Sequence, residues 1–196
     1  SAQAKAGKSA TIGAILASVM CADSDRDGDC FGFSALATKG KAVILLDTEQ
    51  SVYDSFHLVQ RATRRAGQTS LPDQFRPYRL LDVSIADRRA MLQHEMARAA
   101  SVCGGIHSVI IDGIADMCVD PNAPDECFPL VAELIRLAVD YDCPIITVLH
   151  ENPSQLGASG KTRGHLGSQL ERKAESNLRI IKDDEISVVF SEKCRS

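Results

Sequence analysis

The sequence of 196 residues contains no tryptophan, and aromatic residues make up only 5% of it. It also lacks an excess of basic charge, since 22 Lys and Arg stand against 26 Asp and Glu and give a net charge of −4. This balance argues against a protein that coats nucleic acid through bulk charge, although a local basic patch stays possible. No apolar run approaches the roughly 18 residues that a membrane span needs, so we expect a soluble chain without a membrane partner.

The seven cysteines are an odd number and form no CxxC pair. Several of them, including Cys103 and Cys143, stand inside apolar stretches, where a thiol behaves as a small hydrophobic group. This usage does not fit a disulfide framework or a zinc site, and it favours a reduced, cytoplasmic setting.

Apolar residues make up 44% of the chain and charged residues 24%, as in an ordinary globular domain. Strand-like and helix-like stretches alternate almost throughout, which predicts an α/β fold with a mostly parallel sheet covered by helices on both faces. The residues around Asp183–Glu185 predict a C-terminal antiparallel hairpin, and the whole of 1–196 is predicted to be one domain. Predicted strands are 42–47, 77–81, 107–112, 144–150, 177–182 and 186–191; predicted helices are 9–20, 51–66, 84–100, 126–141 and 169–179; and 152–168 is predicted to be a loop.

The first nine residues contain the most informative motif, AQAKAGKS over Ala2–Ser9, which has the spacing of a phosphate-binding P-loop with alanine at the position of the first glycine. Small residues let backbone N–H groups approach phosphates, and the following helix adds the partial positive charge of its amino end. Lys8 is expected to neutralise the β- and γ-phosphates, and the Ser9 hydroxyl to bind Mg²⁺. The residues expected to bind the nucleotide are Ala4, Lys5, Ala6, Gly7, Lys8, Ser9 and Ala10. The alternative is a small-residue turn that contains Gly-Lys-Ser by chance.

Three predicted strands end in residues that suit nucleotide chemistry, at the sheet edge where ligands bind in such folds. Asp112 closes the apolar run HSVIID, the layout of a Walker B motif, and is expected to hold Mg²⁺. Glu49 follows AVILLD by two residues and could activate a water as a general base, although Asp47 or Glu49 could instead cap the next helix. His150 closes PIITVLH and could sense the γ-phosphate, or could be an ordinary hydrogen-bonded residue.

A glycine-interrupted basic segment, 157–168, carries Lys161 and Arg163 two positions apart, so both would point the same way on an extended strand. The pair could contact the nucleotide of a neighbouring subunit, with Arg163 as an arginine finger, or a nucleic-acid backbone. A solvated basic loop is the alternative.

Two further patterns have a weaker claim to function. Asp23–Gly28 imitates the start of a calcium-binding EF-hand loop, but Ser34 stands where the bidentate glutamate should be, so an acidic surface turn is expected. Lys5 and Lys8 before the apolar stretch 10–20 superficially imitate a secretion signal. The P-loop interpretation accounts better for the same residues, and the missing initiating Met suggests a segment of a longer protein.

Taken together, the motifs resemble the RecA-type ATPase core, and in particular the hexameric replicative helicases, including RepA-like plasmid helicases and relatives on mobile elements. The resemblance spans nearly the whole chain, from AQAKAGKS through LLDTEQS, VIIDG and TVLHEN to KTRGHLGSQLERKAESNLRI. It implies that Glu49 is the catalytic base, that His150 senses the γ-phosphate, and that Lys161 and Arg163 reach the adjacent subunit's nucleotide. The strand that precedes the P-loop in that family is missing.

The resemblance implies an ATPase that uses ATP and Mg²⁺, assembles as a homo-oligomeric ring such as a hexamer, and moves on single-stranded DNA as a helicase or translocase. The alternative function is an ATP-dependent regulatory or recombination-accessory protein of the same fold, which the net acidity and scarce aromatic residues favour. A small-molecule kinase would need an acceptor pocket and a lid, to which nothing in the sequence points.

Overall fold

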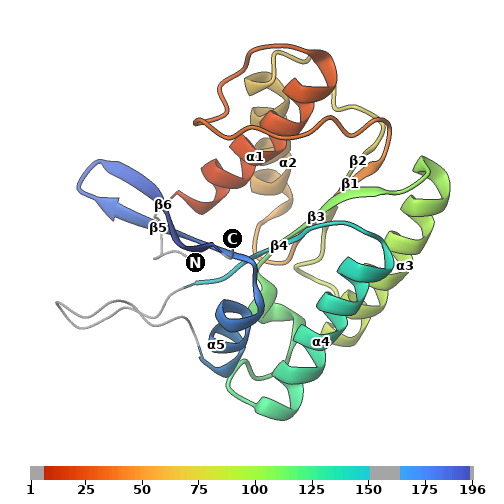
Figure 1. Cartoon of the computed structure of the whole chain (residues 1–196), viewed down its shortest axis with the longest axis vertical. Helices are drawn as coiled ribbons and strands as arrows, with labels where there is room; N and C mark the ends of the chain where they lie inside the picture. The colour runs from red at the N-terminus through yellow and green to blue at the C-terminus, as the bar shows by residue number, and fades with distance from the viewer. Residues whose placement is uncertain (1–6, 151–163, 195–196) are drawn as a thin grey trace.

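A computed structural model describes residues 7–150 and 164–194, and it has the predicted α/β architecture of a parallel sheet with helices on both faces (Figure 1). The elements follow along the chain as α1 (Lys8–Ser24), β1 (Ala42–Asp47), α2 (Val52–Arg65), β2 (Phe75–Arg79), α3 (Ile85–Cys103), β3 (Ile106–Asp112), a short 3₁₀ helix (Ile114–Met117), α4 (Pro124–Asp140), β4 (Ile145–Val148), α5 (Gly164–Lys173), β5 (Ser176–Asp183) and β6 (Ile186–Cys194).

The four parallel strands are ordered β2-β1-β3-β4, and their carboxyl ends therefore meet at one edge of the sheet. Asp47 and Asp112 are Cα partners in the pairing of β1 with β3, so the last residues of the two central strands lie side by side. β1 is buried along its whole length, which its uninterrupted apolar sequence predicts for a central strand of a parallel sheet.

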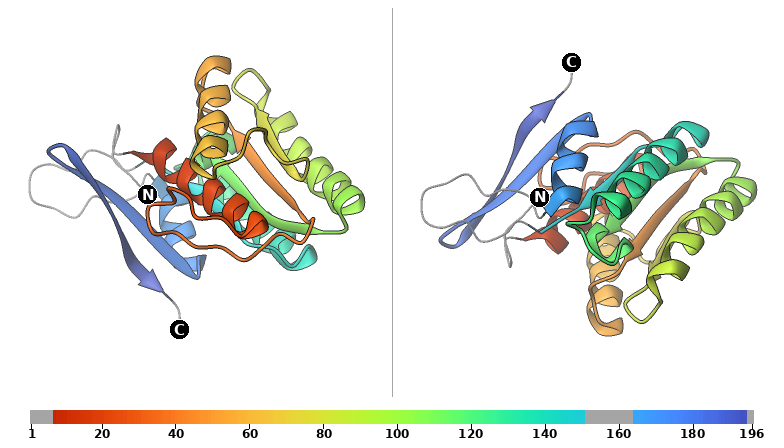
Figure 2. Two further views of the ribbon diagram at one scale, coloured as in Figure 1. Left: turned by 90° about the horizontal axis from the view of Figure 1, so that it is seen from above. Right: turned by 90° about the horizontal axis from the view of Figure 1, so that it is seen from below.

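Each face of the sheet has its own hydrophobic core. α1 and α2 pack on one face over Val43, Leu45 and Ile110. α3, α4 and α5 cover the other face, which presents Ile44 and Ile111. Figure 2 shows the two layers of helices with the sheet between them and the β5–β6 hairpin projecting to one side. The predicted fold class is thus confirmed.

α1 is buried around its whole circumference rather than along one stripe. Ten of its 17 residues are buried, and they include consecutive positions from Thr11 to Ala14 and from Leu16 to Cys21. On its outer side, the segment after α1 folds back towards α2, where Arg65 pairs with Asp29 and covers the ring of Phe31. The helix that follows the phosphate-binding motif is therefore fixed within the core.

The structure corrects several predicted boundaries in the C-terminal part. Residues 164–168, predicted to be loop, form the start of α5, because Leu166 is fully buried against the core. The helix predicted over 169–179 ends at Lys173, and Ser176 already begins β5, whose residues pair with β6. The strand predicted from Pro77 begins at Phe75, and α1, α3, α4 and the hairpin strands differ from prediction by a few residues at their ends.

Candidate functional site

α1 begins directly at the phosphate-binding motif, with Gly7 as its N-cap residue at φ 90°. This left-handed conformation strains any side chain, and a Cβ on Gly7 would also lie 3.2 Å from the Ser187 hydroxyl of the hairpin. Because glycine has no side chain, the N-cap itself offers no acceptor to the N–H groups of the first turn. Those groups and the positive end of the helix dipole suit a bound anion.

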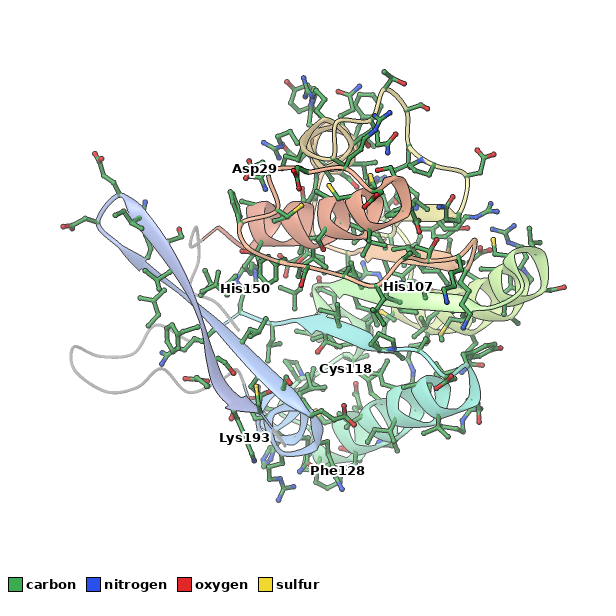
Figure 3. All side chains as sticks on the ribbon, turned by 45° about the horizontal axis from the view of Figure 1, so that its top comes forward. Asp29, His107, Cys118, Phe128, His150 and Lys193 are labelled. Atoms are coloured by element: carbon green, nitrogen blue, oxygen red, sulfur yellow. The ribbon has the colours of Figure 1, made fainter. Side chains whose placement is uncertain are left out.

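Three side chains from distant parts of the chain meet at this end of α1. The Lys8 ammonium lies 3.2 Å from Glu49 Oε2 and also contacts His150 Nε2, which is 3.0 Å from the same glutamate oxygen. The Lys8 side chain is only 10% exposed, whereas Glu49 and His150 are about one third exposed or less. Figure 3 shows His150 at the end of the sheet, beside the amino end of α1. The cluster therefore joins a mostly buried cation to two groups that solvent can still reach.

The charges in this cluster set the ionisation of Glu49. Burial alone would raise the pKa of its carboxyl, but hydrogen bonding with His150 and the charge of Lys8 outweigh burial and hold the pKa below its ordinary value. The same atom, His150 Nε2, makes both contacts. It can donate to Glu49 when it carries a proton and can accept from Lys8 when it does not. Glu49 is thus an ionised carboxylate at neutral pH, held by its partners and able to accept a proton.

Two buried aspartates lie behind this cluster. Asp47 Oδ1 accepts hydrogen bonds from the backbone N–H groups of Glu49 (3.1 Å) and Gln50 (3.0 Å), which fixes the turn that carries Glu49. Asp112 Oδ2 accepts a hydrogen bond from the Gln50 side chain at 3.2 Å. The helix cap comes from Ser51, which accepts from the Asp54 N–H, so Glu49 is not the cap of α2, and Asp47 holds the turn before it.

Each of these aspartates keeps one buried carboxylate oxygen, Asp47 Oδ2 and Asp112 Oδ1, that has no hydrogen-bond partner among the residues the structure describes. Burial raises the pKa of Asp112 to about 6, an effect that Lys8 opposes and that Glu49 and Asp47 strengthen. A buried carboxylate oxygen that lacks a partner is costly unless a cation or a water-bound cation satisfies it. Asp112 therefore offers a hard oxygen donor of the kind that Mg²⁺ prefers, and Ser9, the other residue predicted to bind Mg²⁺, lies on the first turn of α1.

Thr48 and Gly113, which were not predicted as site residues, hold the ends of β1 and β3 together. The Thr48 hydroxyl bonds the backbone carbonyls of Asp112 and Gly113 and the carboxylate of Asp116, each at 3.0 Å. Gly113 has φ 90°, and a Cβ there would lie 2.1 Å from Thr48 Oγ1 and 2.7 Å from Glu49 Cγ. The glycine after the strand-ending aspartate was the available signal, since this close approach excludes a side chain.

Among the predicted site residues, the structure brings together the side chains of Lys8, Glu49 and His150. Asp112 contacts Gln50, which follows Glu49 in the chain. Gly7, Ser9 and Ala10 lie at the start of α1. The predicted residues Ala4, Lys5, Ala6, Lys161 and Arg163 lie outside the described part of the chain.

The segment that imitates a calcium loop does not begin in a surface turn. Asp23 belongs to α1, and its carboxylate accepts hydrogen bonds from the N–H and hydroxyl of Thr38. Within residues 7–150 and 164–194, no cluster of three His, Cys, Asp or Glu side chains could hold a metal. In the same part of the chain, no helix has the length and apolar character to cross a membrane.

The parallel sheet, the glycine-capped helix after a P-loop motif and the acidic strand ends define a P-loop ATPase core. The chain belongs to a family of AAA domains, whose model matches residues 1–155. Membership implies nucleotide binding, usually with Mg²⁺, and ATPase activity.

Among solved structures, the chain is similar to a KaiC-like protein of the hyperthermophilic archaeon Pyrococcus horikoshii OT3. The TM-score is 0.51 at 14% identity, over 100% of this chain and 77% of that chain, which supports a RecA-like fold. No curated protein matches the chain.

Proposed function

We propose that the chain is an ATP-hydrolysing motor domain that works in a ring on single-stranded DNA, as a helicase or translocase. The observation that carries the proposal is the meeting of Lys8, Glu49 and His150 at the amino end of α1. A lysine for phosphate charge and an ionised carboxylate for water activation are the two groups that hydrolysis of a triphosphate requires.

In this proposal each residue has one role. The Lys8 ammonium neutralises the β- and γ-phosphates, and the N–H groups at the start of α1 position them. Glu49 orients the attacking water and accepts its proton, for which its lowered pKa keeps it ionised. His150 contacts the γ-phosphate and, through its contact with Glu49, links the presence of that phosphate to the carboxylate.

Ser9 and Asp112 would hold Mg²⁺, which supplies charge neutralisation at the phosphate oxygens. The raised pKa of Asp112 reflects burial with other carboxylates, an environment that a divalent cation would relieve. Lys161 and Arg163 stay a prediction for the pair that completes the neighbouring subunit's site.

The experiment is phosphate release from Mg²⁺–ATP with and without single-stranded DNA. We expect DNA to stimulate turnover and Lys8→Ala to abolish both hydrolysis and ATP binding. If Lys8→Ala still binds ATP with unchanged affinity, the nucleotide is not at this end of α1. If Arg163→Ala retains full turnover in an assembled ring, its predicted role across the subunit interface is wrong.

A strand-displacement assay separates the motor from the alternative, an ATP-dependent regulatory or recombination-accessory protein. The net charge of −4 and the low aromatic content favour that alternative. ATP hydrolysis without strand displacement or translocation would support it.

A further inference from the structure

A groove of about 610 Å³ runs between α2 and the edge strand β2, on the face of the sheet that α1 and α2 cover. Figure 1 shows these two elements side by side. Among the residues described, the groove is lined by apolar, arginine, amide and hydroxyl side chains and by no Asp or Glu. Its lining includes Phe56, Gln60, Arg64, Gln68, Thr69 and Arg79.

The first turns of α2 carry two exposed aromatic rings, of which Phe56 lines the groove and Tyr53 lies one turn before it. Tyr53 is 70% exposed and Phe56 is 57% exposed, in a chain that has only three tyrosines and six phenylalanines. Both rings pack edge-to-face against His57, with centroids 4.1 Å and 5.6 Å away. Both rings thus contact His57 while most of their surface remains exposed to solvent.

We propose that this groove binds the unpaired bases of a single-stranded nucleic acid, an inference that rests on the proposed function and locates its DNA contact. Tyr53 and Phe56 offer faces on which bases stack, and Arg64 and Arg79 offer positive charge to the phosphates. The amide and hydroxyl groups of Gln60, Gln68 and Thr69 can bond base edges and sugars. The volume falls within the range of small-ligand sites and suits one or two nucleotides.

The acidic residues nearby do not oppose this charge pattern strongly. Asp82 pairs with Arg79 at 2.9 Å but is 73% exposed, so a phosphate can share that arginine from the groove side. Asp54 is bonded to the Ser51 hydroxyl at 2.7 Å within the cap of α2. Neither carboxylate lines the groove.

A protein partner is the less favoured occupant. A stable protein interface buries about 800 Å² on each partner around an apolar centre. Here the exposed apolar side chains of α2 are confined to its first turns, at Val52, Tyr53 and Phe56. Val59, Leu71 and Pro77 also line the groove, but its other lining side chains are hydroxyl, amide or arginine groups, so it lacks a continuous apolar centre.

The position of α2 connects this site to the ATPase chemistry. The helix begins at Val52, three residues after Glu49, and the turn between them is fixed by Asp47. A nucleic-acid strand bound in the groove would therefore contact α2, the helix that begins three residues after the proposed catalytic carboxylate of Glu49.

The absence of tryptophan permits a direct test with the whole chain. Tyr53→Trp introduces a single indole, and we expect its emission to be quenched when dT12 is added without ATP, because a stacked base quenches indole fluorescence. Fluorescence anisotropy with labelled dT12 should show Tyr53→Ala/Phe56→Ala weakening binding about tenfold or more. Arg64→Ala should weaken it and reduce the slope of log affinity against log salt by about one.

The matched control is Phe128→Ala/Arg136→Ala, which removes an exposed ring and an exposed arginine from α4 on the opposite face of the sheet (Figure 3). It should bind dT12 with the affinity of the unaltered chain. Equal losses in the two double variants, or an unquenched Tyr53→Trp that still binds dT12, would overturn the inference. So would loss of self-association in Tyr53→Ala/Phe56→Ala, measured by sedimentation, with dT12 affinity unchanged.

The outcome is separable from that of the proposed function, because binding is read without ATP. Hydrolysis that is stimulated by DNA together with unquenched indole would refute the groove alone. Quenching without any ATP hydrolysis would refute the ATPase proposal and leave the nucleic-acid site standing.

Discussion

Replacing Glu49 with glutamine separates hydrolysis from nucleotide binding at the proposed site. Glutamine keeps the size of the side chain but cannot accept a proton from water. Loss of general-base catalysis at such a position lowers turnover by about 10²- to 10⁴-fold. We therefore expect Glu49→Gln to release phosphate at no more than about one hundredth of the original rate.

The same change should strengthen ATP binding. The Lys8 ammonium lies 3.2 Å from Glu49 Oε2, and at an effective dielectric constant of about 20 this attraction is on the order of 5 kcal/mol before desolvation is subtracted. Desolvation offsets most of it and leaves a net value of about 1 kcal/mol. Because that carboxylate competes with phosphate for Lys8, its removal should raise ATP affinity by about fivefold.

The assay pairs phosphate release at saturating Mg²⁺–ATP with equilibrium binding of a fluorescent ATP analogue. Asp140→Asn is the control, since it removes one carboxylate from the ion pair with Arg136 at the end of α4 and should change neither quantity. A Glu49→Gln variant that retains more than a tenth of the turnover, or that binds ATP less tightly, would refute the reasoning.

Two further predictions concern stability. Gly113→Ala should lower the free energy of unfolding, measured in urea, by about 2–4 kcal/mol, because its Cβ would lie 2.1 Å from Thr48 Oγ1 at a φ of 90°. The control Gly67→Ala, which has a φ of 64° and nothing within 4 Å of its Cβ, should lower that free energy by only about 1 kcal/mol. Hydrogen bonding from Arg98 lowers the pKa of Glu95 below its ordinary value, so the pair stabilises the fold above that value and the contribution disappears as pH falls through the lowered pKa. The stability difference between the unaltered chain and Glu95→Gln, measured in urea at pH 7 and below pH 4, should therefore shrink in acid, and a difference independent of pH would contradict it.

The central strands were predictable because a strand that is buried on both faces of a sheet has an uninterrupted apolar sequence. β1 was predicted at its observed bounds, and the acidic strand ends followed from it. The predicted strand 77–81 lies two residues beyond the observed β2, Phe75–Arg79, because the prediction places Pro77 at the start of the strand. Proline lacks an N–H for the ladder, but an edge strand leaves one side of its backbone unpaired, so Pro77 fits within β2.

The C-terminal elements depended on contacts that a local pattern does not contain. Residues 164–168 contain two glycines, yet burial of Leu166 against the core stabilises a helix there. The residues after Lys173 have mixed polarity, and they form β5 because β6 pairs with them across the turn at Asp184–Glu185. The contacts of Lys8 with Glu49 and His150 were expected only as a shared edge, since side-chain distances across 142 residues do not follow from spacing.

The burial of α1 on every side limits how a motor built on this core can move. A helix enclosed by the sheet, by α2 and by the returning segment around Asp29 and Phe31 cannot slide or tilt without opening a cavity beneath it. If ATP is cleaved at the tip of this helix, as proposed, the movement that follows must come from parts of the protein outside α1. We therefore expect α1 to keep its position during the reaction cycle while neighbouring parts of the protein move.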